Sequence, residues 1–296
     1  MCSSMATDTS NFKNFRKTSR MLTIVENGLS AADDILKSLK IKSGIPVIGV
    51  TGPPGAGKST LVVKLIAGFL EENKRIAVLA VDPSSPFTSG SLLGDRIRMQ
   101  SYATHPNVYI RSVATRGALG GLSSKVMEMT DILRSSGYDY VLIETVGVGQ
   151  SEVEIAALAD ITLVVLVPEA GDEVQSIKAG IMEIGDAFIV NKADREGADQ
   201  FANNLKHLTQ RQTTAIPVFK TVATKGDGME EVINFIKNFK KPEAKVNLLA
   251  QKAFLLIQDR RMADINRDSL QRELNIAALA ADFNIYKYVE SKIKNS

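Results

Sequence analysis

The chain has few of the side chains that metal sites and disulfide scaffolds require. Its 296 residues include one cysteine, two histidines and no tryptophan. The lone Cys2 cannot form an internal disulfide, and with only His105 and His207 beside it the chain cannot build the His/Cys cluster of a zinc site. These scarcities exclude a disulfide-stapled scaffold and favour a reducing compartment.

Long apolar runs and a strong excess of one charge are also missing. Because no stretch reaches the roughly 18 apolar residues of a membrane span, we expect no transmembrane helix and no secretory signal. The net charge of +3 does not indicate a general polyanion binder, and no nucleic-acid motif is visible. We therefore expect a cytoplasmic protein without nucleic-acid or membrane partners. The basic residues 1–20 fit either an unstructured terminus or, less commonly, a mitochondrial transit peptide.

The middle of the chain alternates short β-rich runs with longer helical patterns, and 44% of all residues are hydrophobic, which is ample for a core. Several runs are apolar throughout, as expected for strands buried on both faces. This pattern predicts an α/β fold with a mostly parallel sheet. The expected strands are Pro46–Thr51, Arg75–Val81, Val108–Val113, Tyr138–Thr145, Ile161–Val167, Ala187–Val190 and Ile216–Phe219. The expected helices are Ser59–Glu72, Leu122–Ser135, Val153–Ala159, Val174–Ile184 and Met229–Phe239.

Helical extensions flank this region, so we expect an N-terminal extension over 1–43, a central domain over 44–240 and a C-terminal helical arm over 241–296. Met21–Leu39 predicts two short helices that separate at Asn27-Gly28. The C-terminal residues contain no glycine after Gly228 and no proline after Pro242, and apolar residues recur there near helical spacing. That apolar stripe fits either packing onto the parent domain or contact with a second copy of the chain.

A phosphate-binding loop is predicted between the first strand and the next helix. Residues Gly52-Pro-Pro-Gly-Ala-Gly-Lys-Ser59 match G-x-x-x-x-G-K-[ST] in the strand–loop–helix context that the motif needs. The glycines let successive backbone N–H groups point at phosphate oxygens, while Lys58 reaches the β- and γ-phosphates and Ser59 offers a hydroxyl to Mg²⁺. The residues expected to bind phosphate are Gly52, Gly55, Ala56, Gly57, Lys58, Ser59 and Thr60.

A second motif predicts which nucleotide base is bound. It is Asn191-Lys192-Ala-Asp194, which follows a buried strand. A carboxylate at Asp194 can accept from both N1–H and the 2-amino group of guanine, whereas adenine offers no such pair of donors. The nucleotide should therefore be GTP or GDP. The segment Thr221-Val222-Ala223 offers backbone N–H groups to the guanine oxygen.

Three acidic residues follow strands or loops where Mg²⁺ needs oxygen ligands beside Ser59, namely Asp82, Asp95 and Glu144. Asp82 and Asp95 also fit ordinary helix caps. Glu144 heads Glu-Thr-Val-Gly147, the D-x-x-G form of a γ-phosphate sensor with Glu in place of Asp. We expect Lys58, Glu144 and Gly147 to serve catalysis.

Taken together, seven segments resemble the MeaB/ArgK family of P-loop GTPases, from about residue 15 to the end of the chain. They are Gly52–Thr60, Val81–Pro86, Leu93–Ile97, Arg116–Gly121, Glu144–Gln150, Pro168–Asp172 and Asn191–Asp194. The resemblance implies the fold of the SIMIBI class, which includes signal-recognition-particle and metallochaperone GTPases. Members are homodimeric GTPases that accompany adenosylcobalamin-dependent acyl-CoA mutases, especially methylmalonyl-CoA mutase, gating cofactor delivery and protecting or reactivating the mutase.

The resemblance also implies roles for the loops. It identifies Pro83–Asp95 and Gly147–Glu152 with two nucleotide-sensing switches, and Pro168–Lys178 with a third switch that contacts the mutase through Asp172 and Lys178. For the C-terminal apolar stripe, the resemblance favours contact with a second copy of the chain over packing onto the parent domain.

The same pattern predicts slow hydrolysis by the lone protein, because Val148 follows Gly147 where Ras-like proteins have a glutamine that orients water. Three alternatives stay open. One is a metallochaperone GTPase for nickel enzymes, which the scarcity of Cys and His disfavours. Another is a kinase acting on amino-acid transport proteins, for which no acceptor pocket is apparent. The third is a binding module whose phosphate loop has lost hydrolysis, which the intact Lys58, Ser59 and Glu144 disfavour.

Overall fold

The computed structural model describes most of the chain. The described residues are 9–41, 44–82, 99–114, 124–145, 155, 158–171, 184–209, 215–240, 247–262, 265, 267–279 and 283–294. Two compact units are distinguished, residues 1–252 and residues 253–296. Within the described residues, no helix is long and apolar enough to cross a membrane.

The first unit is built on a seven-stranded sheet in which every strand pair is parallel. The strands are β1 (Val47–Thr51), β2 (Ile76–Asp82), β3 (Val108–Ala114), β4 (Tyr140–Thr145), β5 (Ile161–Leu166), β6 (Ala187–Asn191) and β7 (Val218–Thr221). Their order in the sheet is β3-β2-β4-β1-β5-β6-β7. The predicted fold class and all seven predicted strands are confirmed.

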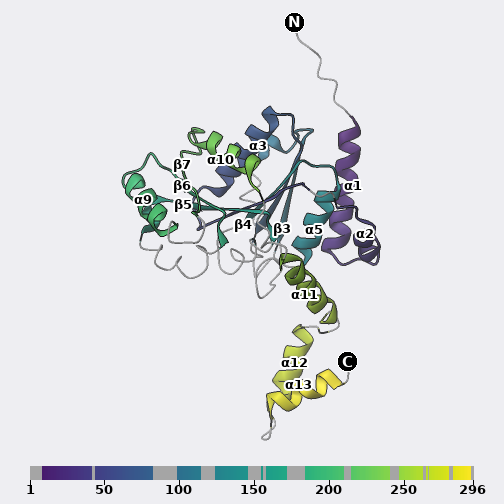
Figure 1. The fold of residues 1–296 in the computed structure, drawn as a ribbon. Helices are drawn as coiled ribbons and strands as arrows, with labels where there is room; N and C mark the ends of the chain where they lie inside the picture. Colours follow the sequence, from purple (N-terminus) through teal and green to yellow (C-terminus); the bar gives the residue numbers. More distant parts are fainter. Residues whose placement is uncertain are drawn as a thin grey trace. The chain divides into compact units, whose positions relative to one another are not determined.

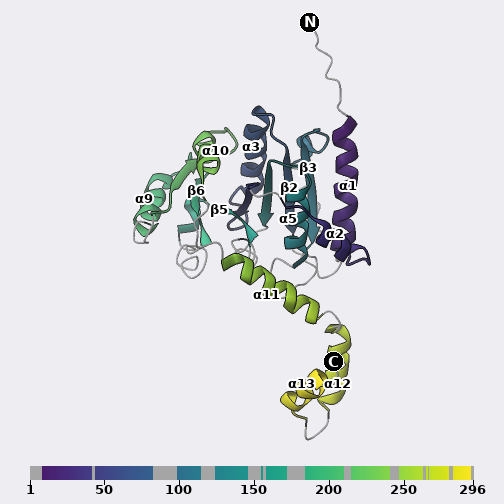
Figure 2. The same cartoon turned by 45° about the vertical axis from the view of Figure 1, so that its right-hand side comes forward.

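Helices cover both faces of this sheet (Figures 1 and 2). Those of the first unit are α1 (Thr9–Glu26), α2 (Ala32–Ser38), α3 (Lys58–Glu71), α5 (Ser124–Ser135), α9 (Ala198–Thr209) and α10 (Met229–Asn238), with short 3-10 helices η1 (Gln100–Tyr102) and η2 (Pro168–Gly171). Helices α3 and α10 share one apolar core with the sheet, whereas α1, α2 and α5 share a second core on the other face. A third, smaller core joins α9 to β5 and β6.

Alternation along β1 explains how one strand serves two cores. Ile48 and Val50 belong to the α3 core and Val47 to the α1–α5 core, because neighbouring side chains of a strand point to opposite faces. Gly49 carries no side chain on that second face, and a Cβ there would lie 2.8 Å from the side chain of Ile155. The glycine therefore permits close packing of the segment that precedes β5.

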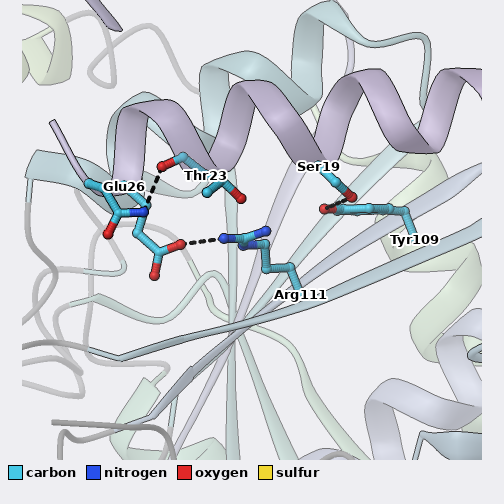
Figure 3. A network of polar contacts seen from close by, with 6 residues as sticks. Ser19, Thr23, Glu26, Tyr109 and Arg111 are labelled. Atoms are coloured by element: carbon cyan, nitrogen blue, oxygen red, sulfur yellow. Dashed lines mark hydrogen bonds and ion pairs between the residues drawn. The ribbon is translucent and has the colours of Figure 1, made fainter. Parts of the chain in front are cut away.

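Helix α1 is fixed to the edge strand β3 by polar contacts (Figure 3). Glu26 accepts from the guanidinium of Arg111, and the hydroxyls of Ser19 and Tyr109 lie 3.0 Å apart. Leu22 and Val25 are fully buried on the same helix face. The buried apolar side chains and the polar contacts with β3 together explain why this segment packs against the sheet as a helix, although its exposed side is strongly basic.

Two expectations for the helices need correction. Residues 9–20, interpreted from sequence as a basic terminus, form the first part of α1, so the first helix begins twelve residues earlier than Met21. The break expected at Asn27-Gly28 is confirmed, with Gly28 at φ +60°. Helix α9 was not predicted at all. The expected helices over 153–159 and 174–184 lie mostly outside the described residues.

The C-terminal residues are helical as expected, but they form three helices: α11 (Asn247–Arg261), which begins in the first unit, then α12 (Arg267–Ala277) and α13 (Ile285–Lys294). Helix α13 begins without a glycine or proline signal because Asn284 caps it. Its Oδ1 accepts from the backbone N–H of Tyr286 at 3.0 Å and of Lys287 at 3.2 Å. Helices α12 and α13 are joined by a 3.0 Å hydrogen bond from the hydroxyl of Tyr288 to Glu273.

Candidate functional site

The predicted phosphate loop connects β1 to α3, next to the centre of the sheet. All three of its glycines have conformations that other residues rarely adopt, Gly52 with φ +133°, Gly55 with φ +77° and Gly57 with φ +90°. A Cβ on Gly52 would lie 2.0 Å from the carbonyl oxygen of Val165, and one on Gly57 would lie 2.3 Å from the side-chain nitrogen of Asn191. Both positions therefore require glycine, for close approach as well as for φ.

Lys58 begins α3 with its side chain folded over the loop. The residue is only 6% exposed, and its Nζ donates to the carbonyl oxygens of Gly52 at 2.8 Å and Pro53 at 2.9 Å. These carbonyls hold the ammonium group at the mouth of the loop, beside the N-terminus of α3. A positive charge at that place complements the oxygens of a phosphate chain.

Ser59 and Glu144 meet beside the loop, although 85 residues separate them in sequence. The Ser59 hydroxyl donates to Oε1 of Glu144 at 2.6 Å, and both residues are buried. The pairing follows from the sheet, because β1 and β4 are neighbours and Glu144 lies opposite Val50. A hydroxyl and a carboxylate are the ligand types that Mg²⁺ prefers, so this pair fits the proposed metal.

The other expected metal ligands are less completely described. Asp82 is the last residue of β2, and Val81 before it pairs with Thr145 after Glu144, so the backbone places Asp82 at the same sheet edge. Asp95 and Gly147 lie outside the described residues. Within the part of the chain that is described, no group of three or more His, Cys, Asp or Glu forms a metal cluster.

Asn191, the last residue of β6, connects the two halves of the site. Its Nδ2 donates to the carbonyl oxygen of Ala56 in the phosphate loop at 2.8 Å. Its Oδ1 accepts from Thr221 Oγ1 and from the backbone N–H of Ala223, each at 3.1 Å. The residue is 3% exposed. One buried amide thus ties the phosphate loop to the turn after β7, which the motif alone did not indicate.

The base-recognition residues extend from this anchor. Lys192 adopts φ +56°, an unusual conformation for a residue with a side chain. Two residues further on, the Asp194 carboxylate is half-exposed and lies 3.6 Å from Nζ of Lys225. The carboxylate is therefore open to solvent at the same sheet edge as the phosphate loop, where a base could reach it.

The segment from Thr221 to Ala223 lies beside the motif as expected, but the N–H groups of Val222 and Ala223 already have partners. The N–H of Val222 donates to the carbonyl of Asp227 at 3.0 Å, and that of Ala223 donates to Asn191. In this structure the segment supports Asn191. Its contact with the guanine oxygen stays a prediction.

Sequence reasoning missed an ion pair between Arg195 and Glu169 at the rim of the site. Glu169 lies in η2, directly after β5, and its hydrogen bond from Arg195 lowers the pKa of the carboxyl group. Both side chains are half-exposed. The pair joins the guanine motif to the start of the segment expected to be the third switch, and only the position of Arg195 next to the motif could have pointed to it.

We expect Asn191→Ala to lower the free energy of unfolding by about 2–4 kcal/mol, because it leaves the buried carbonyl of Ala56 and the N–H of Ala223 without this partner. Affinity for GDP should fall with it, since the phosphate loop and the base site lose their common anchor. Chemical denaturation and GDP titration measure the two effects. The exposed Asn204→Ala on α9 is the matched control, and equal behaviour of the two variants would contradict the anchoring role.

The parallel sheet carries a glycine-rich phosphate loop after its central strand. A buried asparagine joins this loop to the segment that bears an exposed guanine-recognition carboxylate. These features together define the class of P-loop GTPases. Residues 18–276 match the sequence model of the family described as methylmalonyl Co-A mutase-associated GTPase MeaB. The chain belongs to this family, binds guanine nucleotide and is a GTPase.

Three comparisons place it among known proteins. A protein of Pyrococcus horikoshii that bears the name of a GTPase is 47% identical over 82% of this chain and 80% of its own length. The methylmalonic aciduria type A homolog, mitochondrial, of Mus musculus is 40% identical over 65% of this chain and 48% of its own. A solved structure described as LAO/AO transport system kinase has a TM-score of 0.64 and 22% identity, covering 99% of this chain and all of that one, which shows a shared fold.

Proposed function

We propose that this GTPase is a chaperone of an adenosylcobalamin-dependent acyl-CoA mutase, first of all methylmalonyl-CoA mutase. In this role it gates cofactor loading and protects or reactivates the enzyme. The observation that carries the proposal is the family match over residues 18–276, whose description names that mutase as the partner. The relative from Mus musculus, named for methylmalonic aciduria, supports the same client.

Hydrolysis on this site is attack of water on the γ-phosphate in line with the leaving group, without a covalent enzyme intermediate. Lys58 neutralises charge on the β- and γ-phosphates, and the backbone of the phosphate loop orients them. Ser59 and Glu144, with Asp82 and Asp95 as further oxygen donors, would hold Mg²⁺, which neutralises phosphate charge when bound. Gly147 is assigned to γ-phosphate sensing by its position in the motif.

We propose that the protein acts as a homodimer through its C-terminal arm. The second unit exposes many large apolar side chains: Phe254, Leu255, Ile257, Met262, Ile276, Leu279, Ile285, Tyr286, Val289 and Ile293. Leu279 is 85% exposed. So many solvent-facing apolar groups on one short unit favour burial against a second copy.

The decisive experiment measures GTP hydrolysis with Mg²⁺ in the presence and absence of methylmalonyl-CoA mutase from the same organism. We expect a slow basal rate that the mutase raises at least about tenfold, because a partner can order the segments that sense the γ-phosphate. An unrelated acyl-CoA enzyme serves as control. A rate indifferent to the mutase would remove this client while leaving the GTPase intact.

The same assay separates the chaperone from a kinase. Release of inorganic phosphate from GTP without an added protein acceptor supports hydrolysis, because water is then the acceptor. Phosphate transfer that appears only when a transport protein is added would favour the kinase alternative.

A further inference from the structure

Two threonine side chains meet where the neighbouring strands β1 and β4 end. The hydroxyl of Thr145, the last residue of β4, donates to the hydroxyl of Thr51, the last residue of β1, at 3.1 Å. Both residues are buried, and 94 positions separate them in the chain. Thr51 directly precedes the phosphate loop and Thr145 directly follows Glu144. The contact therefore joins two parts of the nucleotide site.

This contact lies on the face of the sheet opposite the Ser59–Glu144 contact. Neighbouring side chains of a strand point to opposite faces. Glu144 reaches Ser59 on the face that α3 covers, so Thr145 points to the other face. Val50 belongs to the α3 core, so Thr51 after it also points to that other face. The end of β4 is thus held to the phosphate loop and its flanking elements from both faces.

The hydroxyl contact also extends the pairing of the two strands. The backbone pairing of β1 with β4 ends with Val50 opposite Glu144. Thr51 and Thr145 come next in the two strands, and their side chains connect the strands beyond this last backbone pair. Their hydrogen bond therefore restricts how far Glu144 can move relative to the phosphate loop.

Packing alone does not require hydroxyl groups at these two positions. Thr145 pairs with Val81 of β2, and Thr51 pairs with Val164 of β5, so the row across four strands reads Val-Thr-Thr-Val. Valine has nearly the shape of threonine and buries no polar group. Replacing both partners of a buried hydrogen bond by apolar groups of the same shape is nearly neutral or stabilising. What the hydroxyl pair supplies is therefore a fixed geometry rather than stability.

We propose that Thr51 and Thr145 are positioning residues for GTP hydrolysis. Their hydrogen bond keeps Glu144 in place relative to Ser59 and the phosphate loop, from the sheet face opposite that contact. Such restraint matters because a misplacement of about 1 Å in an active site can lower a rate about 100-fold. This positioning concerns hydrolysis by the chain itself and is independent of the mutase partnership.

The test compares Thr51→Val, Thr145→Val and the double variant with the unchanged full chain, over a range of GTP concentrations. We expect each variant to lower kcat at least about tenfold, because the restraint on Glu144 is lost. The KM for GTP and the affinity for GDP should change less than about threefold, because the donors of the phosphate loop and the base site remain. The double variant should be no slower than the single variants, since all three lack the same hydrogen bond.

Thermal unfolding separates the effect on geometry from the effect on stability. Each single variant leaves one buried hydroxyl without its partner and should unfold at a lower temperature than the unchanged protein. The double variant removes both hydroxyls and should unfold at a higher temperature than either single variant. Slow hydrolysis by this more stable double variant would show that the rate follows the hydrogen bond and not the stability of the fold.

A conservative variant and a matched control complete the experiment. Thr145→Ser keeps the hydroxyl and should hydrolyse GTP within about threefold of the original kcat. Thr162→Val makes the threonine-to-valine change on β5, at a fully buried hydroxyl without a hydrogen-bond partner in the described part of the chain, and should leave kcat unchanged.

Three results would overturn the positioning role. The first is a kcat of Thr145→Val within about twofold of the original, which would show that the restraint has no effect on the chemical step. The second is a Thr145→Ser variant as slow as Thr145→Val. The third is a double variant that regains the original kcat together with its stability.

Discussion

Lys58→Ala is expected to lower the rate of GTP hydrolysis at least about 100-fold, the effect typical of losing one donor aimed at transition-state charge. The ammonium group is buried at the mouth of the phosphate loop and is held there by the carbonyls of Gly52 and Pro53. Single-turnover hydrolysis with saturating GTP isolates the chemical step from nucleotide binding.

The matched control is Lys64→Ala, which removes the same charge from the same helix at a partly exposed position. It should hydrolyse GTP at the rate of the unchanged protein. Thermal unfolding of both variants distinguishes loss of catalysis from loss of fold, because the loop carbonyls lose a donor only in Lys58→Ala. A Lys58→Ala rate within about tenfold of the original would contradict the catalytic assignment.

The sheet was predictable because its strands are buried on both faces, which makes them continuous apolar runs. The residues Ile161–Leu166 of β5 show this plainly, since all six are buried. Parallel pairing then brings the ends of distant strands to one edge. The sequence therefore predicts both the strand–loop–helix context of the phosphate loop and the position of Asn191 after a strand.

Helix α9 was missed although its apolar residues carry a helical pattern. Phe201, Leu205 and Leu208 recur at i, i+4 and i+7 and pack with β5 and β6, so this face of the helix was open to prediction despite the many polar residues around it. Helix α1 was shortened for a different reason. Its basic residues suggested a solvated terminus, whereas Glu26 and Ser19 find partners on β3 about ninety residues away.

The connections within the site were also beyond sequence reasoning. The motif identifies Asn191 as part of a guanine site, but its bond to Ala56 joins residues 135 positions apart. The Ser59–Glu144 contact spans 85 positions in the same way. Local patterns name the residue types that nucleotide chemistry needs, whereas strand order decides which of them touch.

The second large effect is expected from Asp194→Asn, which should invert base preference from GTP to XTP. The Asp194 carboxylate accepts from N1–H and the 2-amino group of guanine in the proposed complex. An asparagine would turn an NH₂ group towards that amino group, placing donor against donor. Xanthine carries a carbonyl oxygen at position 2, which the NH₂ group can instead bind.

We expect kcat/KM for GTP to fall about 100-fold or more and that for XTP to rise correspondingly, because a site built around hydrogen bonds rejects a mismatched partner strongly. Stability should change by less than about 1 kcal/mol, since Asp194 is half-exposed and its ion pair with Lys225 is a 3.6 Å contact between two solvent-exposed side chains. A change in base preference with little change in stability would distinguish the role of Asp194, which recognises the base, from that of Asn191, which anchors the site.

Asp199→Asn is the matched control for this experiment. It makes the same acid-to-amide change in an exposed carboxylate that is likewise paired with a lysine, Lys220, but lies on α9 outside the motif. Its base preference should stay with GTP. If Asp194→Asn kept its preference for GTP within about threefold of the original, the carboxylate would not be the group that recognises guanine, and the donor–acceptor argument for the base would fail.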